Sequence, residues 1–250
     1  MIPRILVCGT RDYPGVLKEP VFHDRTDAGR VLGRLVRNSV TGAPPIVLAL
    51  PRGGVPVGFE VAMQLPSATF DVFLVRKLGV PGREELAFGA IATGGIRVLN
   101  RAGVEQAGLS LETIDHIAQR EQVELERREL VFREGRPPLD LHARVVVLVD
   151  DGLATGATMM AAVQAVRLQG PRRLVVAVPV ASREARKDLQ STVADEVICA
   201  RVPYPFYAVG CWYRDFDQVT DRQVRDLLRR FKPPEPAPST TPHTAHRTNG

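Results

Sequence analysis

Short apolar runs and amphipathic stretches alternate along this chain of 250 residues. Apolar runs that are rich in branched residues lie at 46–50, 70–76, 145–149, 173–181 and 195–200. Runs of this length without alternating polar positions are typical of strands that are buried on both faces of a sheet. The pattern therefore predicts a parallel sheet whose faces are covered by helices.

Helical periodicity fills most of the segments between these runs. From Thr26, apolar residues recur at the i, i+3, i+4, i+7 and i+8 spacing of an amphipathic helix, which Asp24 or Thr26 is placed to cap. Pro56 stands near the first position of the next predicted helix. Thr220 and Gln223 form the T-x-x-Q pattern of a capping box before a last helix. Further helices are expected at residues 57–65, 110–134, 159–169 and 182–190.

Residues 77–86 contain two glycines and a proline among charged residues, a composition that predicts a mobile loop. The segments 88–93 and 96–100, separated by Gly94 and Gly95, are expected to form a hairpin. The repeating strand-helix order favours an α/β fold, a doubly wound and mostly parallel sheet flanked by helices.

Residues 1–231 are expected to form this domain together with a small hood subdomain. Residues 232–250 contain five prolines and lack a core-forming pattern, so they are expected to be a disordered tail. The packing of the N-terminal segment 5–13 cannot be predicted from its sequence.

Composition narrows the function classes. The apolar runs are too short for a membrane span and the N-terminus lacks a secretory signal, so a cytoplasmic protein without a membrane partner is expected. Three widely spaced cysteines indicate neither disulfides nor a zinc site. The net charge of +5 suits anionic small substrates, and its scatter along the chain leaves a nucleic-acid partner as a secondary possibility only. Whether the chain forms a homodimer is left open.

The segment RVVVLVDDGLATGAT, residues 144–158, carries the strongest chemical signal. Asp150 and Asp151 follow a buried strand directly, at the edge where open α/β sheets bind ligands. The Gly and Thr residues after them can direct backbone N–H groups and hydroxyls at one anion near a helix N-terminus. The competing interpretation is a solvated Asp-Asp turn before a capped helix, which would leave these small residues unexplained.

This segment resembles the signature of type I phosphoribosyltransferases, which bind 5-phosphoribosyl-1-diphosphate (PRPP). The resemblance implies that Asp150 and Asp151 face the ribose hydroxyls and that Mg²⁺ is the cofactor. It also implies a loop around the 5-phosphate made of Ala154, Thr155, Gly156, Ala157 and Thr158.

Three further stretches resemble parts of this family. The loop at Arg52, Gly53 and Gly54 matches the one that binds the diphosphate. Arg76 and Lys77 end the predicted strand at 70–76, so they are expected at the same sheet edge, where they would help to neutralise the diphosphate; they match basic residues before a catalytic loop. Within that loop, Glu84 or Glu85 is a candidate proton donor or acceptor, although exposed loop glutamates are usually only solvated.

The nature of the acceptor stays open, because two indications conflict. Ala154 matches the adenine enzymes and removes the acidic base that 6-oxopurine enzymes have at this position. Residues 205–216, however, resemble the hood of the 6-oxopurine enzymes. In this hood Phe206, Tyr207 and Trp212 are candidates to bind a base, and Asp215 is a candidate metal ligand beside Asp150 and Asp151. The alternative is that these aromatic residues belong to the core and its rim.

The resulting expectation is a Mg²⁺-dependent transferase that moves a phosphoribosyl group from PRPP to a nitrogenous base, with a nucleobase as the favoured acceptor, as in nucleotide salvage. In this mechanism Asp150, Asp151 and Lys77 are catalytic together with Glu84 or Glu85. A non-catalytic PRPP sensor and a plain interaction domain are the alternatives. A dinucleotide-dependent dehydrogenase is disfavoured, since no GxGxxG motif follows a strand.

Overall fold

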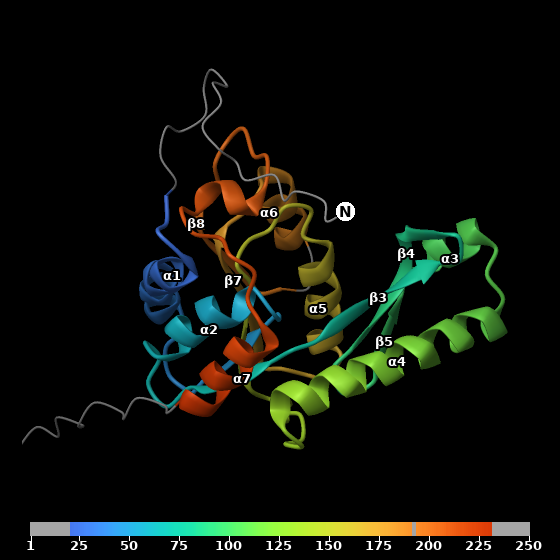
Figure 1. The fold of residues 1–250 in the computed structure, drawn as a ribbon, viewed down its shortest axis with the longest axis horizontal. Coiled ribbons are helices and arrows are strands. Elements are labelled where there is room, and N and C mark those ends of the chain that lie inside the picture. The colour runs from blue at the N-terminus through green and yellow to red at the C-terminus, as the bar shows by residue number, and fades with distance from the viewer. Residues whose placement is uncertain (1–20, 192–193, 232–250) are drawn as a thin grey trace, which may run out of the picture.

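The computed structural model describes residues 21–191 and 194–231. The predictions for the N-terminal segment and for the tail at 232–250 lie outside these residues. A sheet with helices on both sides forms the body of the molecule, and a long arm of strands and helices projects from it (Figure 1). No helix in the described ranges combines the length and the apolar character needed to span a bilayer.

Five parallel strands make up the main sheet, in the order β2-β1-β6-β7-β8. They are β1 (Ile46–Ala49), β2 (Thr69–Val72), β6 (Val145–Val149), β7 (Arg173–Val180) and β8 (Glu196–Arg201). The strand order reverses between β1 and β6, and such a switch point leaves a crevice at the carboxyl ends of the two strands. The predicted doubly wound sheet is confirmed, and its topology places the crevice beside Asp150 and Asp151.

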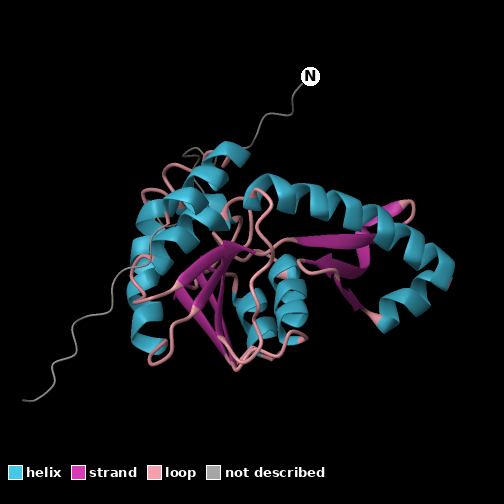
Figure 2. Ribbon diagram, turned by 90° about the horizontal axis from the view of Figure 1, so that it is seen from below, coloured by secondary structure: helices cyan, strands magenta, loops and turns pink. Residues whose placement is uncertain are grey.

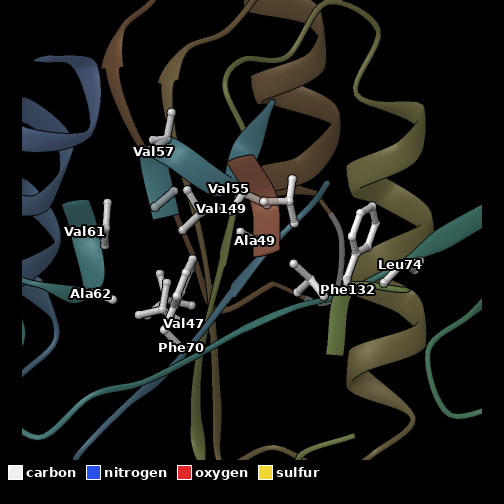
Figure 3. Close-up of a cluster of buried hydrophobic side chains, with 14 of the residues drawn as sticks. Val47, Ala49, Val55, Val57, Val61, Ala62, Phe70, Leu74, Phe132 and Val149 are labelled. Atoms are coloured by element: carbon white, nitrogen blue, oxygen red, sulfur yellow. The ribbon is translucent and has the colours of Figure 1, made fainter. Parts of the chain in front are cut away.

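Helices cover both faces of this sheet. One face carries α1 (Arg25–Ser39), α2 (Gly54–Ala62) and α7 (Asp221–Arg230), and the other carries α5 (Ala157–Arg167) and α6 (Arg183–Gln190). Successive side chains of β6 point alternately to the two helix-covered faces of the sheet. Val147 packs with α1, α2 and α7, whereas Val146 and Leu148 pack with α5 and α6. Figure 3 shows part of the first cluster, to which Val55 and Val61 of α2, Val149 of β6 and Phe70 of β2 all belong.

Side-chain caps fix two helix starts where the sequence predicts them. Asp24 caps α1, because its Oδ1 accepts a hydrogen bond from the Asp27 N–H at 2.8 Å. Thr220 and Gln223 form the complete capping box of α7. An N-cap of this kind contributes about 1 kcal/mol.

The arm differs from the prediction. Residues 77–86 do not form a loop, because β3 (Val75–Val80) and β4 (Arg83–Ala92) pair as antiparallel strands, followed by β5 (Ile96–Leu99). The predicted strand at 70–76 is likewise divided, with its first part in β2 and its last part in β3. The hairpin expected at Gly94 and Gly95 is confirmed as the β4–β5 connection. Helices α3 (Arg101–Ala107) and α4 (Leu111–Arg133) complete the arm (Figure 2).

One buried arginine joins the arm to the body. The side chain of Arg133, at the end of α4, is 2% exposed, and its Nε lies 2.9 Å from Asp71 Oδ2 in β2. Its Nη2 donates to the Val72 carbonyl at 2.7 Å, and its Nη1 donates to Glu129 at 3.2 Å. The ion pair with Asp71 and these two hydrogen bonds thus compensate the buried guanidinium and hold α4 against the edge of the main sheet.

Candidate active site

Two loops meet at the switch point of the main sheet. The loop after β1 ends at Gly53, the N-cap of α2, whose first residue is Gly54, and the loop after β6 begins with Asp150 and Asp151. The backbone joins them, since the Leu50 N–H donates to the Val149 carbonyl at 2.8 Å. The predicted diphosphate loop and the predicted carboxylate pair therefore lie side by side. The peptide bond between Pro51 and Arg52 in the first of these loops is cis.

The absence of side chains at Gly53 and Gly54 allows this close approach. A Cβ on Gly53 would lie 2.0 Å from Asp151 Oδ2, and a Cβ on Gly54 would lie 2.8 Å from the Val149 carbonyl oxygen. Both distances are below the closest approach that real Cβ atoms make. Glycine is thus needed here for space, and the Asp151 carboxylate rests directly on the loop after β1.

Arg25 is a site residue that the sequence analysis missed. Its Nε donates to Asp151 Oδ2 at 2.8 Å, and both side chains are largely buried, with exposed fractions of 11% and 15%. Its Nη1 donates to the Asp217 carbonyl at 2.7 Å, and its guanidinium lies 3.8 Å from the centre of the Phe216 ring. These contacts fix the guanidinium, which in turn fixes one oxygen of Asp151.

The two carboxylates have unequal surroundings. Burial, together with the neighbouring negative charge of Asp151, raises the pKa of Asp150 well above its usual value. Burial also raises the pKa of Asp151, and the adjacent Arg25 opposes this shift. Asp150 Oδ1 accepts a hydrogen bond from the Asp151 N–H at 2.8 Å, and the Tyr213 hydroxyl donates to the Asp151 carbonyl at 2.6 Å. The protein therefore orients this pair firmly while concentrating negative charge on it.

The predicted phosphate loop opens α5. Gly156 is the N-cap of this helix, with φ of 73°, and it offers no side chain to cap the first turn. Ala154, Thr155, Ala157 and Thr158 are exposed. The Ser182 hydroxyl fixes this loop by donating a hydrogen bond to the Ala154 carbonyl at 2.7 Å. An exposed helix N-terminus of this kind favours an anion through its N–H groups and the helix dipole.

The basic residues predicted to neutralise diphosphate lie in different places. Arg52 is half-exposed in the loop after β1, with Nη1 3.6 Å from Asp221 Oδ1. Arg76 and Lys77 do not end a strand of the main sheet, because they belong to β3 in the arm. Arg76 donates from Nε to Glu121 of α4 at 2.6 Å, and Lys77 is exposed. The expected placement of Arg76 and Lys77 was therefore wrong, since β2 ends at Val72.

Glu84 and Glu85 lie in β4 instead of in a loop. Their assignment as acid or base stays a prediction. For either glutamate to act in this way, the arm would have to bring β4 close to the acceptor.

The aromatic residues predicted to bind a base in the hood differ in their exposure. Phe206 and Trp212 stack with ring centroids 6.3 Å apart, but Trp212 is only 4% exposed and packs with Phe22 and Tyr213 in a core cluster. Its burial argues against the base-binding role predicted for it, because little of its surface is open to a ligand. Phe206 is half-buried and Tyr207 is 56% exposed, so both keep that role as a prediction.

Asp215 is not assembled with the carboxylate pair. Its side chain is 67% exposed and lies 3.9 Å from His23 Nδ1. Over the described residues, no group of three or more His, Cys, Asp or Glu side chains is arranged to hold a metal ion. The structure therefore does not support Asp215 as a metal ligand beside Asp150 and Asp151.

Comparisons with known proteins agree with this geometry. The family model for the phosphoribosyl transferase domain matches residues 25–206. Two Mycobacterium tuberculosis proteins, "Putative phosphoribosyl transferase MT0597" and "Putative phosphoribosyl transferase Rv0571c", are each 46% identical over 210 residues. Each alignment covers 84% of this chain and 47% of the relative, so the chain spans about half the length of these curated relatives.

A solved structure shares the fold. The protein TT1426 from Thermus thermophilus superposes with a TM-score of 0.75 at 45% identity, covering 83% of this chain and 97% of that one. The matched family region contains the loop after β1, the carboxylate pair and the N-terminus of α5. The chain belongs to the type I phosphoribosyltransferase family.

Proposed function

We propose that the protein transfers a 5-phosphoribosyl group from PRPP to a nitrogenous base and releases diphosphate, with Mg²⁺ as cofactor. The observation that carries this proposal is the direct contact between the loop after β1 and the Asp150–Asp151 pair, beside the open N-terminus of α5. These three elements offer complementary groups to the diphosphate, the ribose and the 5-phosphate of one donor molecule.

The carboxylate pair is suited to bind ribose. Asp151 Oδ2 is held by Arg25 and Asp150 Oδ1 by the Asp151 N–H, so each carboxylate is oriented through one oxygen. We assign the other oxygen of each to the two vicinal hydroxyls of the donor, since ionised carboxylates only accept hydrogen bonds. The 5-phosphate would then lie against the backbone N–H groups around Gly156.

In the reaction, the bond from the ribose C1 carbon to the diphosphate oxygen breaks, and the leaving diphosphate takes the electron pair. A ring nitrogen of the acceptor forms the new bond to C1 and loses its proton to a base or to solvent. Positive charge develops on the ribose in between, and the negative charge of Asp150 and Asp151 is placed to stabilise it.

The chemistry of the site fits Mg²⁺. The ion is commonly held by one or two carboxylates together with substrate phosphates, without a cage made by protein alone. Asp150 and Asp151 supply hard oxygen ligands, and the raised pKa of Asp150 reflects burial and crowded negative charge that a cation would relieve. When bound, Mg²⁺ would neutralise the diphosphate as it leaves.

A diphosphate-release assay tests this function. Wild type is incubated with PRPP, Mg²⁺ and a panel of bases that includes adenine, hypoxanthine, guanine, uracil and orotate. Asp151→Asn is expected to lower release with the active base at least tenfold, because the neutral amide no longer stabilises the ribosyl cation. Asp215→Asn, which removes an exposed carboxylate outside the pair, is the matched control and is expected to stay within twofold.

The outcomes separate the candidate functions. Release at the wild-type rate by Asp151→Asn would overturn the assigned role of the pair. Donor binding by the wild type without release in the presence of any base would instead favour a non-catalytic PRPP sensor.

A further inference from the structure

A small polar cavity lies between the body and the arm, and we call it the arginine pocket. Its volume is about 150 Å³, roughly ten times the 10–15 Å³ that one water molecule needs. It therefore has room for an oxyanion. Its lining residues are Arg52, Arg127, Arg128, Val131, Phe132 and Asp221.

Three elements that are distant in sequence build this pocket. Arg52 comes from the loop after β1, Arg127 and Arg128 come from α4, and Asp221 is the first residue of α7. Arg52 directly precedes Gly53, the residue that rests on the Asp151 carboxylate. The pocket is thus adjacent to the proposed donor site, and α4 brings two arginines of the arm to it.

One carboxylate holds both arginines of α4. Glu124 accepts hydrogen bonds from Arg127 Nε at 2.7 Å, from Arg127 Nη2 at 3.0 Å and from Arg128 Nε at 2.9 Å. These two guanidinium groups lower the pKa of Glu124 to about 2, so it stays ionised at neutral pH. Glu124 lies on the solvent-accessible surface of α4, where such pairs are weak and a competing anion can replace the carboxylate.

Positive charge exceeds negative charge around the pocket. Arg52, Arg127 and Arg128 carry three positive charges, and Glu124 and Asp221 carry two negative ones. Asp221 is only loosely engaged, with its Oδ1 3.6 Å from Arg52 Nη1. A guanidinium has five N–H donors, of which the bonds to Glu124 use two on Arg127 and one on Arg128.

We propose that the arginine pocket is an oxyanion subsite in which Arg127 and Arg128 of α4 join Arg52 in binding a phosphate or carboxylate group. Guanidinium groups are well matched to such groups because they donate two parallel hydrogen bonds. Glu124 acts as an internal counter-ion that the ligand displaces. The ligand is either the diphosphate of the donor or an acidic group on the acceptor, and this identity rests on the proposed function.

Calorimetric titration with inorganic diphosphate tests the subsite without turnover. The double variant Arg127→Gln/Arg128→Gln is expected to bind diphosphate at least tenfold more weakly than the full wild-type chain. The control is Arg222→Gln, which removes an arginine of α7 that is 86% exposed and pairs with Asp226. It is expected to change the affinity less than twofold. Equal affinities of the double variant and the wild type would overturn the proposal.

A second variant changes the affinity in the opposite direction, which a folding defect cannot imitate. Glu124→Gln removes the internal counter-ion and leaves both arginines in place. We expect it to bind diphosphate at least threefold more tightly than the wild type. Unchanged or weaker binding by this variant would contradict the role of Glu124 as a displaceable counter-ion.

Further titrations identify the source of the oxyanion. If the subsite binds the donor's diphosphate, the double variant loses affinity for PRPP with Mg²⁺ but not for ribose 5-phosphate. If it binds an acidic acceptor, the double variant loses affinity for orotate and keeps its affinity for PRPP. A wild type that binds diphosphate but not PRPP would refute the proposed function and leave the subsite standing.

Discussion

The contact between Gly53 and Asp151 makes the replacement Gly53→Ala a sharp test of the site. The added Cβ would lie 2.0 Å from Asp151 Oδ2, whereas ordinary van der Waals contact begins at 3.4 Å. The carboxylate must therefore move by about 1.4 Å, and its hydrogen bond to Arg25 at 2.8 Å must break or shift with it. A misplacement of about 1 Å in a catalytic group can lower the rate by about 100-fold.

We therefore expect Gly53→Ala to lower kcat/KM for diphosphate release by about 100-fold, which corresponds to about 2.7 kcal/mol of transition-state stabilisation. Steady-state kinetics with varied PRPP measure this loss, and thermal unfolding checks that the variant is folded. Gly103→Ala in α3 is the matched control, because its Cβ would lie no closer than 3.4 Å to the surrounding atoms. Wild-type kinetics for a folded Gly53→Ala would refute the account of how the two loops meet.

Three other predictions follow from buried groups. Arg25→Gln removes the positive charge that opposes the rise in the pKa of Asp151, so this carboxylate becomes protonated at higher pH. The acidic limb of the pH profile of diphosphate release should therefore move to higher pH. A limb that does not move would contradict the pairing of Arg25 with Asp151. Arg133→Met leaves Asp71 buried without its charged partner and should lower the free energy of unfolding, measured in urea, by about 3–5 kcal/mol. The double variant Arg133→Met/Asp71→Asn should recover part of this loss. If the losses of the two single variants simply add in the double variant, the two side chains do not stabilise each other. Burial raises the pKa of Cys199 to about 11, so iodoacetamide should label this thiol slowly at pH 8 in the folded protein and readily in urea. Fast labelling in the folded protein would show that the thiol is not shielded.

The loops of the proposed donor site could be predicted because their chemistry is contiguous in sequence. A buried strand, two carboxylates and a Gly-Thr segment follow one another at residues 144–158, and the parallel topology then places them at one sheet edge. The same logic located the loop at Gly53 and Gly54. Local patterns also sufficed for most helices and for the capping box of α7.

Arg25 escaped prediction because nothing local marks it. It stands 126 residues before Asp151, at the first position of an amphipathic helix, where an arginine usually faces solvent. Only the packing of α1 against the body, with Phe216 beneath the guanidinium, brings it to the site. A long-range ion pair of this kind has no signature in a single sequence.

The arm was missed for a related reason. The glycines and the proline at residues 79–82 signal a break, and the sequence does not show whether a loop or a tight hairpin results. The pairing of β3 with β4 is stabilised by Leu78, Phe88 and Ile91, which are buried in one cluster with Ile117 of α4. Tertiary burial therefore decided between the two outcomes. It also removed Arg76 and Lys77 from the sheet edge where they were expected.

Calorimetric titration of PRPP into the protein in the presence of Mg²⁺ tests the central claim most directly, because it needs no knowledge of the acceptor. The account predicts one PRPP per chain for the wild type. It also predicts an affinity at least tenfold weaker in Asp150→Asn/Asp151→Asn, because both carboxylates are assigned to the ribose. Undetectable binding to the wild type, or equal affinity in the double variant, would contradict the assignment of this sheet edge as the donor site.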